Sequence, residues 1–106
     1  MSKLSEALVS VWEQSLRDRR DTVEVDGSAV PVTRTRAKGL LVVEFRFDGH
    51  AIEGIEQNPQ TSSRWAKMAQ EGKRIVQFRS KGRYFANVAE GKLTRYPAWT
   101  TLGLPD

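Results

Sequence analysis

The chain has 106 residues, 39% of them hydrophobic, and a net charge of +4, values typical of one globular domain spanning 1–106. It contains no cysteine and one histidine, which excludes disulfides, thiolate zinc sites and iron–sulfur clusters. We therefore expect no metal and no other cofactor. The sequence also lacks a signal-like start and a long apolar run, so we expect no membrane span and a cytoplasmic location.

The first predicted element is an amphipathic helix over residues 3–20. Apolar residues recur there at the three- and four-residue spacing of a buried helix face: Leu4, Ala7, Leu8, Val11, Trp12 and Leu16. Residues 22–56 alternate apolar and polar side chains around turn pairs such as Asp48-Gly49, which predicts β-hairpins. Pro31 has no N–H to donate, so its strand is expected at a sheet edge or with the proline pointing outward.

A short helix is predicted over 62–71, and residues 73–97 then form further hairpins that turn at Lys81-Gly82 and Glu90-Gly91. The tail, 98–106, is expected to pack back onto the domain through its apolar residues, Trp99, Leu102 and Leu104. Four strands, a short helix and three strands in this order predict an α+β fold. We expect an N-terminal helix against a strongly curved, mainly antiparallel sheet of about seven short strands.

Positive charge is concentrated in the last part of the chain. Residues 64–106 carry nine basic residues against three acidic ones, whereas residues 1–21 carry four of each. Such an asymmetry favours an anionic partner. The alternative is that these charges form an ordinary solvated face.

The segment KGRYFANV, residues 81–88, resembles the aromatic strand motif of RNA-recognition modules, which stack bases on aromatic side chains. Tyr84 and Phe85 are adjacent here, however, and adjacent residues of a strand point to opposite faces. The element order also lacks the two strand–helix–strand units of that family. We therefore do not assign the chain to the family and retain only the stacking chemistry.

The last three strands are expected to have one core face and one basic face. The predicted core face consists of Val76, Phe78, Tyr84, Ala86 and Val88. The predicted nucleic-acid-binding residues are cations and rings of the other face and its turns: Arg79, Lys81, Arg83, Phe85, Lys92, Arg95 and Tyr96. The sequence thus favours a small non-enzymatic module that binds single-stranded DNA or RNA.

Two other hypotheses stay open. The first is a protein-interaction or assembly module, a homodimer or a complex with another protein, whose contact residues are Phe85, Tyr96 and Trp99. The second is a small enzyme that uses His50 as a base with nearby glutamates, Glu53 and Glu56. No nucleophile motif and no glycine-rich phosphate loop accompanies them.

Overall fold

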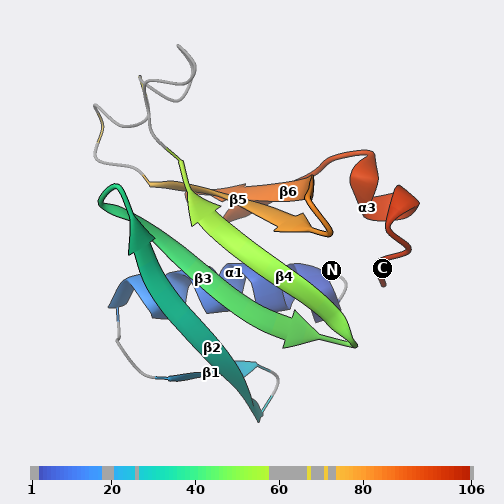
Figure 1. Ribbon diagram of the computed structural model, residues 1–106, viewed down its shortest axis with the longest axis horizontal. Coiled ribbons are helices and arrows are strands. Elements are labelled where there is room, and N and C mark those ends of the chain that lie inside the picture. Colours follow the sequence, from blue (N-terminus) through green and yellow to red (C-terminus); the bar gives the residue numbers. More distant parts are fainter. Residues whose placement is uncertain are drawn as a thin grey trace.

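The computed structural model describes residues 3–17, 21–25, 27–57, 67, 71 and 74–105, and these residues confirm the predicted α+β class. An N-terminal helix lies against a curled antiparallel sheet of seven strands (Figure 1). Each strand pairs with the next one along the chain. The elements are α1 (Lys3–Arg17), β1 (Thr22–Val25), β2 (Ser28–Ala37), β3 (Leu40–Phe47), β4 (His50–Glu56), β5 (Ile75–Ser80), β6 (Arg83–Ala89), β7 (Lys92–Arg95) and α3 (Ala98–Thr101).

Two-residue turns join the neighbouring strands of four hairpins. In each turn a non-glycine residue with φ near +50° precedes a glycine, at Lys38-Gly39, Asp48-Gly49, Lys81-Gly82 and Glu90-Gly91. Positive φ at both positions gives a turn whose twist matches that of the flanking strands. The helix predicted over 3–20 ends at Arg17 among the described residues. Residues 18–20 lie outside the described residues, as does the predicted helix over 62–71 apart from Lys67 and Glu71.

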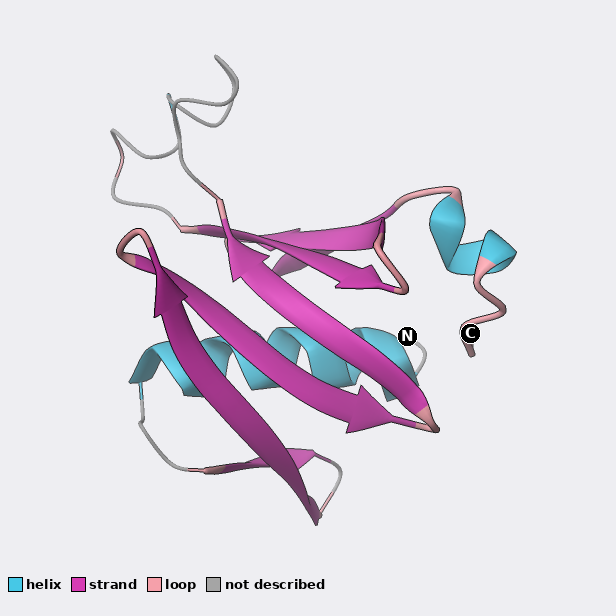
Figure 2. Ribbon diagram, in the orientation of Figure 1, coloured by secondary structure: helices cyan, strands magenta, loops and turns pink. Residues whose placement is uncertain are grey.

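Helix α1 fills the concave side of the curved sheet, as Figure 2 shows. Its predicted apolar stripe is confirmed, because Leu4, Leu8 and Val11 are at most 1% exposed and Leu16 packs against the same cluster. The stripe joins inward-pointing side chains of the strands in one hydrophobic core. Burial of this apolar surface is the main favourable term that holds the helix on the sheet.

Polar side chains of α1 also join the helix to both edge strands. Gln14 donates from its amide nitrogen to the carbonyl of Glu24 in β1, at 2.8 Å, and its amide oxygen accepts from the Glu24 N–H at 3.1 Å. At the other edge, Arg95 of β7 donates to the hydroxyl of Ser5 at 3.0 Å. The helix therefore lies between the first and the last strand and links them across the open side of the half-barrel.

Strand β2 changes its pairing at Pro31. Residues 28–31 pair with β1, whereas residues 32–37 pair with β3. Pro31 is exposed, as expected for a residue without an N–H at the edge of a sheet. Beyond Asp21, whose carbonyl accepts from the N–H of Val32, the described part of β1 no longer covers β2.

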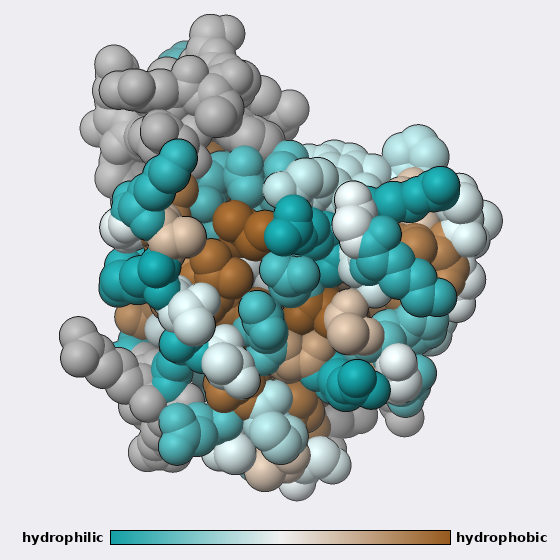
Figure 3. All heavy atoms as spheres, viewed as in Figure 1, coloured by the Kyte–Doolittle hydropathy of each residue, from teal (hydrophilic) through white to brown (hydrophobic). Residues whose placement is uncertain are grey.

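The outer face of the sheet is mixed in polarity. In Figure 3 hydrophobic side chains lie in the middle of this face among hydrophilic ones. Two of the apolar residues there are Val42 and Ile55, half-buried partners in the β3–β4 register. Among the described residues, no helix is long and apolar enough to cross a membrane.

Candidate nucleic-acid interface

A β-bulge in the β5–β6 pair decides which side chains reach the outer face of the sheet. Phe78 pairs with Ala86, but the next residue, Arg79, pairs with Tyr84, so Phe85 has no partner in β5. A bulge of this kind adds one residue to one strand and reverses the alternation of faces beyond it. The side chains of residues 83 and 84 therefore lie on faces opposite to those that simple alternation predicts.

The prediction that Phe85 is an exposed stacking ring is wrong. Phe85 is fully buried, and its ring meets the ring of Trp99 edge-on, with centroids 5.5 Å apart. Trp99 and Leu104 are buried as well, which confirms that the tail packs back onto the sheet. Because Phe85 and Trp99 lie in the core, neither can form the surface contact of the protein-interaction hypothesis.

The prediction that Tyr84 faces the core is also wrong, because the bulge turns it outward. Its side chain is 39% exposed, the one large hydrophobic residue exposed in the described part of the chain. The Arg79 guanidinium lies 5.9 Å from the centre of the Tyr84 ring. Arg79 also donates to the Glu53 carboxylate of β4 at 3.2 Å, and this hydrogen bond raises the pKa of Arg79.

Two further predicted cations lie at the same end of the β5–β6 hairpin. Lys81 occupies the first position of the β5–β6 turn and Arg83 begins β6, and both are exposed. Arg83 pairs with the buried Ser80, so it points to the side of the ladder away from Tyr84 and does not share the outer face that alternation assigned to it. Arg79 lies beside Tyr84, and Lys81 occupies the adjoining turn. A ring of this kind can stack on an unpaired base while the cations bind flanking phosphates.

The phenol of Tyr96 lies across the same outer face. Its oxygen accepts hydrogen bonds from the side-chain amides of Gln77, at 3.1 Å, and Asn87, at 2.6 Å. Gln77 and Asn87 are partners in the β5–β6 register. Each amide donates one N–H to Tyr96, so the side-chain carbonyl oxygens of Gln77 and Asn87 are held in defined directions. We call the surface formed by Gln77, Arg79, Lys81, Tyr84, Asn87 and Tyr96 the hairpin face.

The structure separates the other two predicted cations from the hairpin face. Lys92 pairs with Ala89 at the opposite end of β6, which places it about 20 Å along the strand from Arg83. Arg95 contacts Ser5 of α1, and its guanidinium lies 4.1 Å from the centre of the Trp99 ring. Arg95 thus holds the C-terminal helix and α1 together.

The residues of the enzyme hypothesis do not meet. Glu53 binds Arg79 on the outer face, and Glu56 is six residues along β4 from His50, a separation of about 20 Å. Among the described residues, no three histidine or acidic side chains gather closely enough to hold a metal ion. Neither Glu53 nor Glu56 is therefore placed to orient His50.

The sequence carried one signal that could have identified Tyr84. Two adjacent aromatic residues of a strand point to opposite faces, so one of Tyr84 and Phe85 must lie on the outer face. The sequence does not say which of the two is buried. A tightly packed partner decides it here, since Phe85 fills the space beside Trp99.

Comparison with known proteins identifies no relative of this chain. No protein-family model, no curated protein and no solved structure matches the chain significantly.

Proposed function

We propose that this protein is a small non-enzymatic module that binds single-stranded nucleic acid, DNA or RNA, on the hairpin face. The observation that carries the proposal is the exposed Tyr84 ring with Arg79 beside it and Lys81 in the adjoining turn. Stacking on a ring requires an unpaired base, so a single strand is the expected ligand and a duplex is not. A cytoplasmic location goes with this proposal and stays a prediction.

The amide network supplies a second element of the proposed interface. Gln77 and Asn87 hold fixed positions next to the ring of Tyr96, and their carbonyl oxygens are acceptors for base amino groups. Such contacts would give modest sequence preference. The cations would supply most of the affinity, because they release counterions from the phosphates.

A titration with labelled oligonucleotides tests this function. Single-stranded DNA, single-stranded RNA and a duplex of the same length are compared at about 50 mM and about 200 mM salt by fluorescence anisotropy. With two or three phosphates bound on a single strand, log affinity against log salt should slope at about −1.4 to −2. Equal affinity for the duplex, or no binding at the lower salt concentration, would contradict the proposal.

A role in assembly remains the alternative prediction, as a homodimer or with another protein. Light scattering at micromolar protein separates self-association from a monomer. A monomer that binds single strands supports the proposed function, and a dimer that binds none supports the alternative.

A further inference from the structure

A polar cavity lies on the inner side of the sheet, at the C-terminal end of α1. It has a volume of about 810 Å³, within the range of small-molecule sites. One wall is the last turn of α1, and another is the part of β2 that β1 leaves uncovered. The cavity is lined by Ser15, Leu16, Arg17, Asp21, Val32, Thr33, Arg34, Thr35, Arg36, Leu41 and Arg74. We call it the arginine groove.

Four arginines and one carboxylate are among these lining residues, and the groove keeps a net positive charge although Glu13 pairs with Arg17 and Glu56 pairs with Arg74. The arginines come from three separate segments: Arg17 ends α1, Arg34 and Arg36 alternate along β2, and Arg74 directly precedes β5. Arg34 and Arg36 share a strand face with Val32, which points into the core. Where α1 ends, the inner face of the sheet therefore changes from apolar side chains to guanidinium groups.

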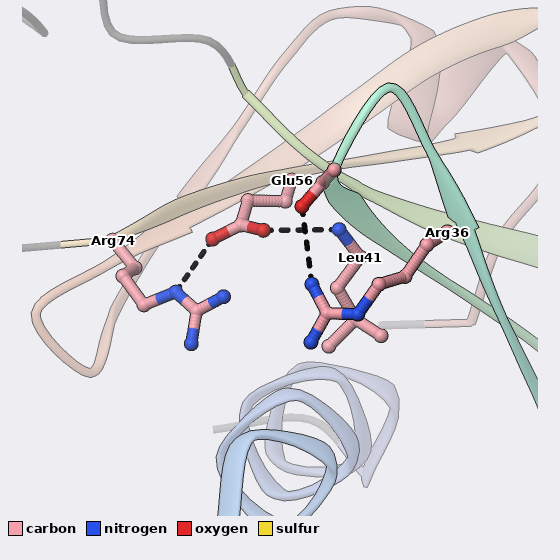
Figure 4. Close-up of polar contacts among 5 residues, drawn as sticks. Arg36, Leu41, Glu56 and Arg74 are labelled. Carbon is pink, nitrogen blue, oxygen red and sulfur yellow. Dashed lines mark hydrogen bonds and ion pairs between the residues drawn. The ribbon is translucent and has the colours of Figure 1, made fainter.

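Glu56 binds one of these arginines, Arg74, and interacts with the charge of a second, Arg36. Its buried carboxylate accepts from Arg74 Nε at 2.5 Å and from the N–H of Leu41 at 2.9 Å (Figure 4). Arg36 lies on the other side and donates to the carbonyl of Gly39 at 3.1 Å. Burial alone would raise the pKa of Glu56, but the bonds from Arg74 and Leu41 and the charge of Arg36 outweigh it and lower that pKa.

These contacts leave donors on both guanidinium groups. Arg74 binds Glu56 through Nε, and Arg36 binds the carbonyl through one terminal nitrogen. In Figure 4 the guanidinium groups of Arg74 and Arg36 are both drawn between Glu56 and α1. Each is held by a partner on the protein, so a ligand would meet preorganised donors and lose less entropy on binding.

We propose that the arginine groove binds a small phosphorylated molecule with more than one phosphate group. A carboxylate uses both of its oxygens on one arginine, whereas phosphate groups offer enough oxygens to engage several guanidinium groups from different directions. No aromatic side chain is among the described lining residues, so these residues favour recognition of charge over stacking of a base. This site is separate from the hairpin face and does not rest on the function proposed for that face.

Isothermal titration calorimetry with inorganic tripolyphosphate tests the proposal, with citrate and adenosine as comparison ligands. Tripolyphosphate should bind, citrate should bind at least about tenfold more weakly, and adenosine should give no heat. Arg36→Gln and Arg34→Gln should each reduce the affinity for tripolyphosphate by about tenfold or more, the effect of losing one charged hydrogen bond. Arg74→Gln is avoided because it would leave the buried carboxylate of Glu56 without its guanidinium partner.

Arg46→Gln is the matched control, because Arg46 is an exposed arginine on the outer face of β3 and does not line the groove. Circular dichroism melting curves verify that each variant is folded. A double variant of the hairpin face, Lys81→Asn with Tyr84→Ala, should bind tripolyphosphate normally. The proposal is overturned if tripolyphosphate gives no heat at millimolar concentration, if citrate binds as tightly, if Arg46→Gln weakens binding as much as Arg36→Gln, or if the double variant loses binding.

Discussion

The Arg79 guanidinium lies 5.9 Å from the centre of the Tyr84 ring, and the two residues are direct partners across β5 and β6. They are partners because the bulge leaves Phe85 unpaired. The same bulge buries Phe85 and exposes Tyr84, so a single irregularity in the ladder sets both the packing of the core and the chemistry of the hairpin face.

The two adjacent rings should respond oppositely to truncation. Phe85→Ala should lower the free energy of unfolding by about 3–5 kcal/mol, because it opens a cavity beside Trp99. Tyr84→Ala should leave stability nearly unchanged and weaken single-strand binding by about 1–3 kcal/mol, whereas Tyr84→Phe keeps the stacking ring. Urea unfolding and anisotropy titrations measure the two effects. A large loss of stability in Tyr84→Ala would contradict the assignment of faces.

Lys81 and Lys38 form a matched pair for testing the charge of the hairpin face. Both occupy the first position of a two-residue turn, with φ of 53° and 54°, and both are followed by glycine. Asparagine tolerates this conformation, so either lysine can be replaced by it with little strain. Lys81→Asn should flatten the slope of log affinity against log salt by about 0.7, the contribution of one single-strand phosphate contact, and Lys38→Asn should not change the slope. Equal slopes in the two variants would remove Lys81 from the interface.

Gly54 should tolerate no side chain. A Cβ atom at this position would lie 2.7 Å from Cε1 of Phe78, whose ring covers the glycine from the paired strand. Gly54→Ala should therefore destabilise the protein by about 1–3 kcal/mol through overpacking. In a Phe78→Leu background the cost should shrink, because the clashing ring atoms are gone. Urea unfolding of all four proteins of this mutant cycle gives the coupling, and additive effects would contradict the predicted clash.

Replacing Ser15 or Ser5, two buried serines of α1, by alanine should change the free energy of unfolding in opposite directions. The Ser15 hydroxyl has no hydrogen-bond partner in the structure as described, whereas the Ser5 hydroxyl accepts from Arg95. Ser15→Ala should raise the free energy of unfolding by about 1 kcal/mol, because it removes an unsatisfied hydroxyl and favours the helix. Ser5→Ala should lower it by a similar amount. Thermal and urea unfolding compare the two variants, and a destabilised Ser15→Ala would show that the hydroxyl is satisfied.

Glu56 should make stability depend on pH in the acid range. Its pKa in the folded protein is lowered, so its stabilising contribution is present above the pKa of an unfolded glutamate, about 4.3, and is lost as pH falls through the lower folded value. The difference in unfolding free energy between the wild type and Glu56→Gln should therefore shrink as pH falls below about 4. Urea unfolding at pH 7 and pH 3 measures it, with the exposed Glu44→Gln variant as control. A difference that grows toward pH 3 would contradict the lowered pKa.

Local patterns in the sequence predict the helix, the strands and the order in which they occur. The helical spacing of Leu4, Leu8 and Val11 requires one buried stripe, and a non-glycine residue followed by glycine specifies a tight turn between strands. These signals are local, because they depend on the conformational preferences of a few consecutive residues. They were sufficient for the α+β class, for the antiparallel pairing of successive strands and for the packing of the tail.

The position of the bulge and the existence of the arginine groove become apparent only in the folded structure. Strict alternation assigned Tyr84 to the core and Phe85 to solvent, and the packing of Phe85 against Trp99 reversed both assignments. The groove depends on where α1 ends relative to β2 and on Glu56, which joins Arg74 to the start of β3. These residues are far apart in the sequence, and no local pattern encodes their meeting. The cause is the long-range fit of side chains in a closed core, which a periodic pattern does not contain.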